Sequence, residues 1–228
     1  MNNKLTIIQN FVVTKEGRLQ IIKKQFNNLG KILGNYEFIV NYDTETYSKE
    51  VKSLYEENIP NFYFSNVVGQ SWSKITRSLV EKCTTPYIYY LVEDNIFFPE
   101  ITSEYFDSML NEFISNKCVN LNLGKVEKYR MEQHWVFMQE KYTRHKFIRT
   151  FRTDHSPLHC LPLAGIWDKN LFLEVLDTIK ESSAYSELLQ FEAHSNRFRS
   201  PEYIASTPVV RIINHEEKVN GKTIKEWR

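Results

Sequence analysis

An acidic tripeptide, Glu93-Asp94-Asn95, directly follows the apolar run Tyr87–Val92. Carboxylate and amide oxygens at the end of a buried strand could hold Mg²⁺ or Mn²⁺, which proteins usually bind through one or two carboxylates together with phosphate oxygens of a substrate. Asp and Asn are also ordinary turn formers. The tripeptide therefore indicates either a turn that binds a metal and phosphates or a plain solvated connection.

A basic segment farther along the chain interleaves cations with aromatic rings and contains no acidic residue from Lys141 through Thr153. Such a surface could hold a phosphorylated acceptor, a lipid headgroup or RNA, because cations contact phosphates and aromatic rings stack on bases. The favoured alternative is a hairpin edge whose charges prevent aggregation. The residues of the segment are Lys141, Tyr142, Arg144, Lys146, Phe147, Arg149, Phe151 and Arg152.

The histidines and cysteines do not form a convincing metal site. His155 and His159 are four residues apart, but Pro157 between them argues against a helical pair of zinc ligands. The three cysteines are odd in number and far apart, which suits neither a disulfide framework nor a Cys-x-x-Cys pair. We therefore expect a reducing, cytoplasmic environment. The cysteines are Cys83, Cys118 and Cys160.

The elements that would position the acidic tripeptide alternate between strand and helix through residues 1–100. Apolar and β-branched runs predict the strands, and apolar residues at helical spacing predict the helices between them. This order predicts an α/β fold with a mostly parallel central sheet, whose ligands bind outside the carboxyl ends of the strands. The expected strands are Leu5–Val13, Phe38–Val40, Phe62–Phe64 and Tyr87–Val92, with helices around residues 19–33, 47–54 and 72–80.

The second half of the chain has a different pattern. From about Gly124 to Leu163, helical periodicity gives way to aromatic and basic stretches that predict antiparallel strands and long loops. We expect this half to be more irregular and partly antiparallel. Its expected elements are a helix around residues 105–113, strands at Val119–Leu123, Trp135–Phe137, Phe147–Arg149 and Val209–Ile213, and helices at Leu171–Ile179 and Glu187–His194.

The bulk composition sets further bounds on the class of protein. The 228 residues are enough for one sizeable core, so we expect a single domain. With 29 basic and 28 acidic side chains the net charge is +1, so the molecule has no global field that would draw it to nucleic acid or to an anionic membrane. No run approaches the ~18 apolar residues that a membrane span needs, and we expect no such span.

In order and spacing these features resemble the family 2 type of GT-A glycosyltransferases over most of the chain. Tyr87–Asn95 resembles the strand and DxD metal motif of that family, with Asp94 in the place of the second, metal-binding aspartate. The motif is degenerate, because Val92 stands in the place of the first aspartate and Asn95 replaces an acid that often follows. The resemblance implies that Asp94 and Asn95 hold Mn²⁺ or Mg²⁺ and that Glu93 and Asp94 face the donor.

The resemblance extends to the loops upstream of this motif. Thr14–Arg18 is similar to the family's first loop, which touches the nucleotide, and Phe38–Asp43 is similar to the strand whose final acid holds the base or ribose. Gly69–Arg77 falls where the family places residues that face the diphosphate. For each residue the alternative is a turn, a helix cap or an exposed helix charge. The implied donor-binding residues here are Thr14, Arg18, Asp43, Lys74 and Arg77.

Two later segments resemble the acceptor side of related transferases. Leu163–Trp167 is similar to an aromatic acceptor segment, and Leu189–Glu192 to the helix that carries the catalytic acid. The resemblance implies that Trp167 faces the acceptor and that Glu192 is the general base, with Glu187 as the runner-up. Trp167 could equally be a core residue, and Glu192 an exposed charge. Since the two glutamates are five positions apart, they point about 140° apart on a helix, and only one is expected to matter.

The function implied by the resemblance is transfer of a sugar, with inversion and metal assistance, from a nucleotide-diphosphate sugar to a hydroxyl of a glycan, a lipid-linked acceptor or a protein. A single domain over residues 1–228 would bind the donor with residues 1–100 and the acceptor with residues 101–228. Two alternatives stay open. One is a nucleotidyltransferase, although no glycine-rich phosphate loop follows the first strand, and the other is a non-catalytic sugar- or RNA-binding module.

Overall fold

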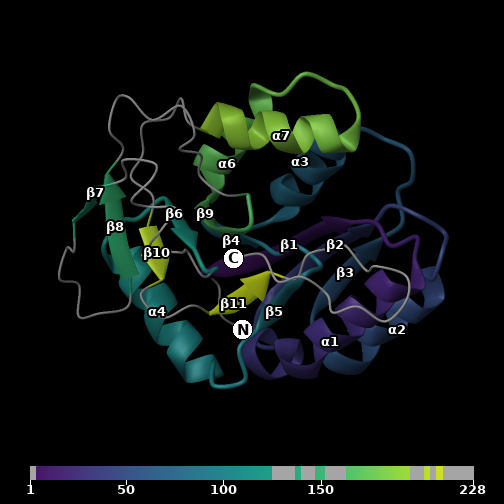
Figure 1. Ribbon diagram of the computed structural model, residues 1–228, viewed down its shortest axis with the longest axis horizontal. Helices are drawn as coiled ribbons and strands as arrows, with labels where there is room; N and C mark the ends of the chain where they lie inside the picture. The colour runs from purple at the N-terminus through teal and green to yellow at the C-terminus, as the bar shows by residue number, and fades with distance from the viewer. Residues whose placement is uncertain are drawn as a thin grey trace.

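The computed structural model describes residues 4–124, 137–139, 147–151, 163–195, 203–205 and 209–212. Figure 1 shows an α/β protein in which helices cover both faces of a central sheet. Several residues singled out from the sequence lie outside the described residues. These are Lys141, Tyr142, Arg144, Lys146, Arg152, His155, His159 and Cys160.

Strands and helices alternate through the first part of the chain, as the sequence pattern predicts. The strands are β1 (Leu5–Phe11), β2 (Glu37–Tyr42), β3 (Phe62–Ser65), β4 (Tyr87–Tyr90), β5 (Asn95–Phe97) and β6 (Asn120–Asn122). The helices are α1 (Glu16–Leu33), α2 (Ser48–Asn58), α3 (Trp72–Lys82) and α4 (Ser103–Ser115). The strand β5, which begins at the last residue of the acidic tripeptide, was not predicted from the sequence.

The later elements include two strands, Gly165–Asp168 and Tyr203–Ala205, that the sequence pattern does not reveal. They are β7 (Phe137–Gln139), β8 (Phe147–Phe151), β9 (Gly165–Asp168), α6 (Lys169–Asp177), α7 (Ala184–Ser195), β10 (Tyr203–Ala205) and β11 (Val210–Ile212). The helices α6 and α7 confirm the two late helices that were predicted. The final predicted strand also exists, but it pairs with β5 in a separate two-stranded sheet.

The main sheet has the strand order β3-β2-β1-β4-β9-β6-β10-β8-β7. The β3-β2-β1-β4 half is wholly parallel, whereas β9 runs antiparallel between β4 and β6, and β8 and β7 extend the far edge in antiparallel fashion. This arrangement confirms the predicted α/β class, with its parallel sheet in the first half and partly antiparallel second half. Within β9, a side chain at Gly165 would place its Cβ 2.6 Å from the carbonyl oxygen of Leu121, so the close strand approach needs glycine.

Two apolar clusters hold the helical layers against the sheet. On one face, α1, α2 and α4 pack through residues such as Phe26, Tyr55 and Phe106, all buried. On the other face, α3, α6 and α7 pack around Trp167 and Phe191. In Figure 1 the second layer lies above the sheet and the first below it. The residues that follow the strands are therefore the ones left to line a site at the sheet edge.

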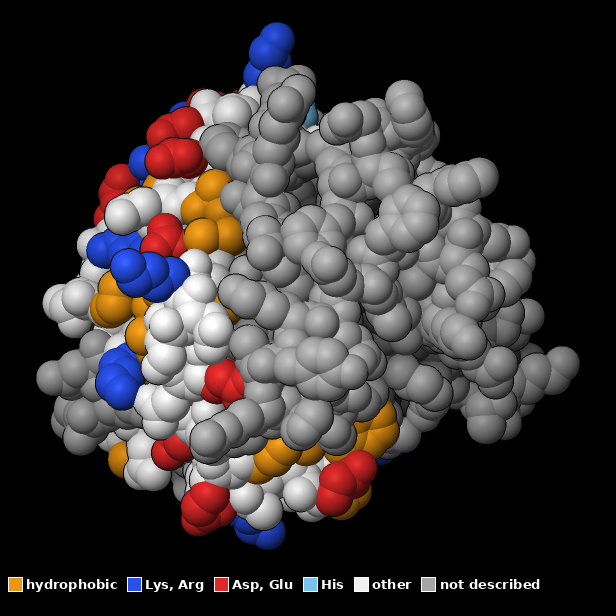
Figure 2. All heavy atoms as spheres, turned by 90° about the vertical axis from the view of Figure 1, so that its left-hand side faces the viewer, with side chains coloured by type: hydrophobic (Ala, Val, Ile, Leu, Met, Phe, Trp, Pro, Cys, Tyr) orange, Lys and Arg blue, Asp and Glu red, His pale blue; other side chains and the backbone are white. Residues whose placement is uncertain are grey.

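The described side chains on one face of the molecule mix the two signs of charge. Figure 2 shows one face of the molecule, on which the described acidic and basic side chains are interspersed. This distribution matches the near-balanced charge of the sequence. Among the helices of the described ranges, none combines the length and the apolar character that crossing a bilayer requires.

Candidate nucleotide-binding and active site

The carboxyl ends of β1, β2 and β4 meet at one edge of the sheet because these strands are parallel neighbours. The register pairs Phe11 with Tyr42 and Ile8 with Tyr90, so the loops that follow the strands leave the sheet together. Most of the residues predicted to contact the donor lie on these loops. They are Thr14, Asp43, Glu93 and Asp94, and Asn95, which was predicted to be a metal ligand, is the first residue of β5.

The acidic turn is the segment Val92–Asn95, which joins β4 to β5. A hydrogen bond of 3.2 Å from the Asn95 N–H to the Val92 carbonyl closes it. The side-chain amide of Gln25 donates to the same Val92 carbonyl at 2.8 Å and to the Asn95 carbonyl at 2.9 Å. One side chain of α1 therefore holds the backbone on both sides of Glu93 and Asp94.

A single face of α1 contacts the acidic turn and the strand after it. Arg18, Ile21 and Gln25 are spaced three and four residues apart, which places them on one side of the helix. Arg18 Nη2 lies 3.3 Å from Glu93 Oε1, and Ile21 packs against Ile96 in β5. The face thus combines an ion pair, an apolar contact and two amide hydrogen bonds along one edge of the turn.

Asp94 is the most buried carboxylate of the turn, with 5% of its surface exposed. Burial raises its pKa from the ordinary 3.8 to about 7, the neighbouring charge of Glu93 adds to the rise, and the Asp94 backbone N–H and Arg18 oppose it. An Asp that is half protonated near neutral pH binds a cation in competition with a proton. The charge of this site is therefore sensitive to any cation that approaches.

The turn carries oxygen atoms of the kind that bind divalent cations. Asp94 supplies a carboxylate, and the buried Oδ1 of Asn95 has no hydrogen-bond partner among the described residues. Across the described ranges, no three or more His, Cys, Asp and Glu side chains gather as a group able to hold a metal by themselves. This donor set suits Mg²⁺ or Mn²⁺ that completes its coordination with water and substrate phosphates.

Asp43 contacts the loop between β3 and α3. Its Oδ1 accepts a hydrogen bond of 2.9 Å from the Gly69 N–H in the loop between β3 and α3. Gly69 has φ of +74°, a left-handed conformation that favours glycine. The second carboxylate oxygen of Asp43, Oδ2, is the one that could contact a ribose or a base. Thr14, after β1, is exposed at the same edge.

Lys74 and Arg77 lie on α3 and have protein partners. Lys74 Nζ forms an exposed ion pair with Glu181 at 2.8 Å. Arg77 contacts Glu81 and Asp177, which directs it toward α6 instead of the acidic turn. Lys74 also lines a small groove of ≈ 140 Å³ between α3 and β3. Their predicted contact with the diphosphate would require both side chains to exchange these partners.

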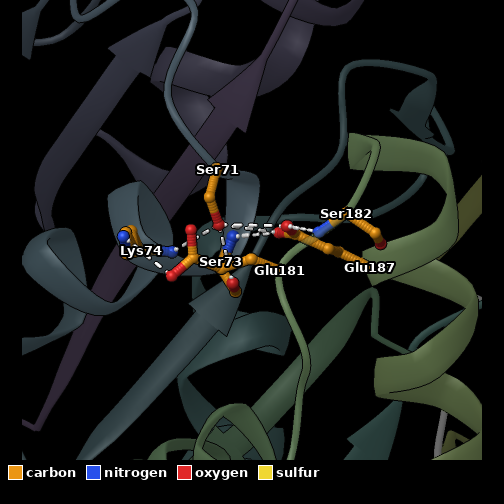
Figure 3. Close-up of polar contacts among 6 residues, drawn as sticks. All are labelled: Ser71, Ser73, Lys74, Glu181, Ser182 and Glu187. Atoms are coloured by element: carbon orange, nitrogen blue, oxygen red, sulfur yellow. Dashed lines mark hydrogen bonds and ion pairs between the residues drawn. The ribbon is translucent and has the colours of Figure 1, made fainter.

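Glu187, the runner-up for the general base, anchors α3. Its carboxylate accepts hydrogen bonds from the Ser71 hydroxyl (3.0 Å to either oxygen), the Ser73 N–H (2.7 Å) and the Ser182 N–H (2.8 Å), as Figure 3 shows. Although burial alone would raise its pKa, these hydrogen bonds lower it below the ordinary value. A stable anion with occupied oxygens suits a structural role at the α3 N-terminus better than proton transfer.

Glu192 lies on α7, five positions later, in different surroundings. It is half-buried, and burial raises the pKa of its carboxyl. A carboxylate that holds its proton more readily suits a general base.

Trp167 is a core residue. Its ring is fully buried and packs against Phe172 and Phe191, and its indole N–H donates to the Leu163 carbonyl at 3.0 Å. With no exposed surface, the ring has a core role, the alternative that the sequence left open.

Sequence reasoning missed the residues that hold the turn. Gln25 falls on the apolar face of α1 between Ile22 and Phe26, and a polar side chain at such a position is the available signal. The buried amide of Gln9 in β1 gives the same signal. Neither signal says which backbone groups the amides contact, since that depends on how α1 lies against the β4–β5 connection.

Comparisons with solved structures show a shared fold. No protein-family model and no curated protein sequence matches the chain. The chain superimposes on Staphylococcus aureus TarS residues 1–349 in complex with UDP with a TM-score of 0.60 at 11% identity, covering 91% of this chain and 59% of TarS 1–349. The same protein with UDP-GlcNAc gives a TM-score of 0.57 at 13% identity, with 91% and 57% covered. The chain thus spans about three-fifths of TarS 1–349.

Two other similar structures match this chain over nearly their whole length. CMP:2-keto-3-deoxy-manno-octonic acid synthetase complexed with CTP has a TM-score of 0.52 at 10% identity, covering 88% of both chains. UDP-glucose pyrophosphorylase complexed with UDP-glucose has a TM-score of 0.52 at 10% identity, covering 89% of this chain and 90% of that one. The chain therefore has the α/β fold of proteins that were solved with nucleotides or nucleotide sugars.

Proposed function

We propose that this protein is a glycosyltransferase that moves a sugar from a nucleoside-diphosphate sugar to a hydroxyl acceptor. The observation that carries the proposal is the acidic turn at the carboxyl end of β4, next to the loops after β1 and β2. In α/β sheets this edge is where ligands bind. Support comes from the shared fold with TarS, which was solved with UDP and with UDP-GlcNAc.

The donor would lie across the strand ends. Asp43 and Thr14 would meet the nucleoside, and Asp94 with Asn95 would hold Mg²⁺ or Mn²⁺ against the diphosphate. When bound, that ion would neutralise the charge that develops on the departing nucleotide. Arg18 neutralises Glu93 through its ion pair, which lowers the repulsion between the turn and an approaching diphosphate.

The transfer step needs one base. As the bond between the sugar anomeric carbon and the diphosphate oxygen breaks, the acceptor oxygen bonds to that carbon and its proton passes to Glu192. The nucleoside diphosphate leaves with the electron pair of the broken bond, and attack from the opposite face inverts the configuration. The raised pKa of Glu192 favours its acceptance of the proton. The acceptor would be a hydroxyl of a glycan, a lipid-linked molecule or a protein.

Titration calorimetry tests the donor and metal assignments together. UDP, GDP and CDP are titrated into the protein with Mn²⁺ and, separately, with EDTA. We expect one nucleotide to bind more tightly with Mn²⁺, and Asp94→Ala to remove that difference, because the carboxylate that joins metal to protein is gone. Equal affinity with Mn²⁺ and EDTA for all three nucleotides would contradict the metal assignment. Lys52→Ala serves as the control, because Lys52 lies on the surface of α2 and forms an exposed ion pair with Glu56.

Nucleotidyl transfer is the second candidate function. It is favoured by the match to UDP-glucose pyrophosphorylase and the CMP-linked synthetase over about nine-tenths of each chain. Incubation with each nucleoside triphosphate and a set of sugar phosphates, followed by a pyrophosphate assay, separates the two functions. Pyrophosphate release that depends on the sugar phosphate would establish nucleotidyl transfer, whereas release of nucleoside diphosphate from a nucleotide sugar on addition of an acceptor would establish glycosyl transfer.

A further inference from the structure

A buried chain of polar side chains runs from α2 through β1 and α1 to the acidic turn. The Tyr55 hydroxyl donates to Gln9 Oε1 at 2.5 Å, Gln9 Nε2 donates to Gln25 Oε1 at 3.4 Å, and Gln25 Nε2 donates to the Val92 and Asn95 carbonyls. Tyr55, Gln9 and Gln25 are almost completely buried. The links from Tyr55 to Gln25 and the link to the Asn95 carbonyl are thus buried, and the link to the Val92 carbonyl is partly buried.

The direction of this chain of hydrogen bonds is fixed at the turn. The Val92 and Asn95 carbonyls can only accept, so the NH₂ group of Gln25 must face them and its Oε1 faces Gln9. Gln9 then donates to Gln25 through its NH₂ group and accepts from the Tyr55 hydroxyl through its oxygen. Burial raises the pKa of Tyr55 well above its ordinary value, and the charge of Glu93 adds to the rise, so the hydroxyl keeps the proton that it donates.

A purely apolar contact would be the simpler way to pack α1 against the β4–β5 connection. Burying amides costs free energy unless every polar group is paired, and here three side chains are buried to present two N–H groups to the turn. The two carbonyls that accept them flank Glu93 and Asp94. The hydrogen bonds therefore fix the orientation of the turn as well as its position.

We propose that Gln25 is a positioning residue, which orients Glu93 and Asp94 so that the turn can receive the diphosphate and its cation. This inference rests on the proposed nucleotide-sugar function and adds to it a residue that touches neither ligand. Gln25 acts through the turn backbone, and Gln9 and Tyr55 orient its amide. Loss of the amide would free the turn to adopt other orientations.

The test compares two variants that each lose buried hydrogen bonds. Gln25→Met keeps the length and volume of the side chain and removes both donors to the turn. Thr85→Val removes the buried 2.9 Å hydrogen bond between Thr85 and Thr6, at the opposite end of β1 and β4. For each protein, calorimetry measures nucleotide affinity with Mn²⁺ and with EDTA, using the nucleotide that binds best, and chemical denaturation measures stability.

We expect Gln25→Met to reduce the Mn²⁺-dependent gain in affinity about tenfold, as the loss of two hydrogen bonds near the site would predict. Its affinity in EDTA should change less than about threefold, because the loops that meet the nucleoside are intact. Thr85→Val should lose comparable stability and keep the full Mn²⁺-dependent gain. General destabilisation would lower the Mn²⁺-dependent gain equally in both variants, so a loss in Gln25→Met alone would indicate a specific role for Gln25.

Further outcomes separate this inference from the function it rests on. If the unaltered protein shows no Mn²⁺-dependent gain, the proposed metal-assisted function fails. If it shows the gain and Gln25→Met retains it, or if Thr85→Val loses it equally, the positioning role is wrong. Should Gln25→Met not fold, Tyr55→Phe removes only the hydroxyl that orients the amides. Tyr55→Phe should lower the gain in the same direction by a smaller factor, and an unchanged gain would overturn the inference.

Discussion

The Ser71 hydroxyl and the Glu187 carboxylate join two helices that are far apart in the sequence. Ser71 is the N-cap of α3, its oxygen lies 3.0 Å from both Glu187 oxygens, and Glu187 also accepts from the Ser73 N–H in the first turn of that helix. A carboxylate at a helix N-terminus is favoured both by the unpaired N–H groups and by the helix dipole. The contact therefore fixes α7 on α3 and places Glu192, one turn and a half along, relative to the sheet.

Replacing Glu187 by Gln should destabilise the protein. The new NH₂ group would face N–H donors at one of the two oxygen positions, so we expect a loss of about 2–4 kcal/mol in the free energy of unfolding at pH 7. Because the pKa of Glu187 is lowered by folding, its stabilisation is present above the ordinary pKa and is lost as the pH falls through the folded-state pKa. Urea denaturation at several pH values measures both effects.

Glu181→Gln is the matched control for this change, since Glu181 forms an exposed ion pair with Lys74 near the same contact. Its loss should alter stability by less than ~1 kcal/mol. Equal stability of Glu187→Gln and the unaltered protein would contradict the anchoring role assigned to Glu187.

Replacing Glu192 by Gln should lower turnover about 10²–10⁴-fold while donor affinity stays near normal, because shape is kept and the proton acceptor is removed. Burial raises the pKa of this carboxyl, so activity should fall with acidification at a pH above the ordinary value for Glu. Initial rates across pH, with the donor in excess, give both results. An active Glu192→Gln protein would leave the proposed inversion without its base.

Replacing Asp94 by Asn should raise stability at alkaline pH. In the folded protein Asp94 has a pKa of about 7 against an ordinary 3.8, so between these values the folded state holds more protons and its stability declines as the pH rises. At about 1.4 kcal/mol per pKa unit, the variant should gain up to roughly 4 kcal/mol at pH 8 relative to pH 4. Denaturation curves of both proteins at the two pH values test this, and parallel pH profiles would contradict the raised pKa.

Two substitutions at Asp43 separate its contact with Gly69 from a contact with the donor. Asp43→Asn keeps an oxygen that can accept from the Gly69 N–H but removes the charge, whereas Asp43→Ala removes both. If Asp43 meets the ribose or base, each variant should weaken nucleotide binding by ~1–3 kcal/mol. If Asp43 only shapes the loop, Asp43→Asn should bind nucleotide normally. Calorimetry with the best-binding nucleotide decides between them.

The parallel half of the sheet could be predicted from the sequence because its elements are long and periodic. The spacing of Leu19, Ile22, Phe26 and Leu29 defines the buried face of α1, and the apolar run of β4 marks a central strand. β9 could not be predicted. It is four residues long, and nothing in Gly165–Asp168 says that it inserts between β4 and β6, since that is decided by pairing between distant segments.

The candidate site was predictable in place but not in detail. Strand ends locate Asp43 and Asp94, because ligands bind at that edge of a parallel sheet. The burial of Asp94 depends on how α1 covers the turn, which no local pattern reveals. Glu187 and Glu192 were expected to face different ways on one helix, and the structure gives them different surroundings: the first is buried at the start of α3, and the second is half-buried without those donors.

The antiparallel insertion of β9 has a consequence for the order of assembly. As the chain leaves the ribosome, β1 to β4 can form a parallel sheet, but the free edge of β4 gains its neighbour only after Asp168 has been synthesised. Until then an apolar strand with unpaired backbone groups is open to pairing with other chains. The same insertion joins the two halves of the sequence in one sheet. Misassembly and chaperone binding would therefore be most frequent while only the first half of the chain has been synthesised.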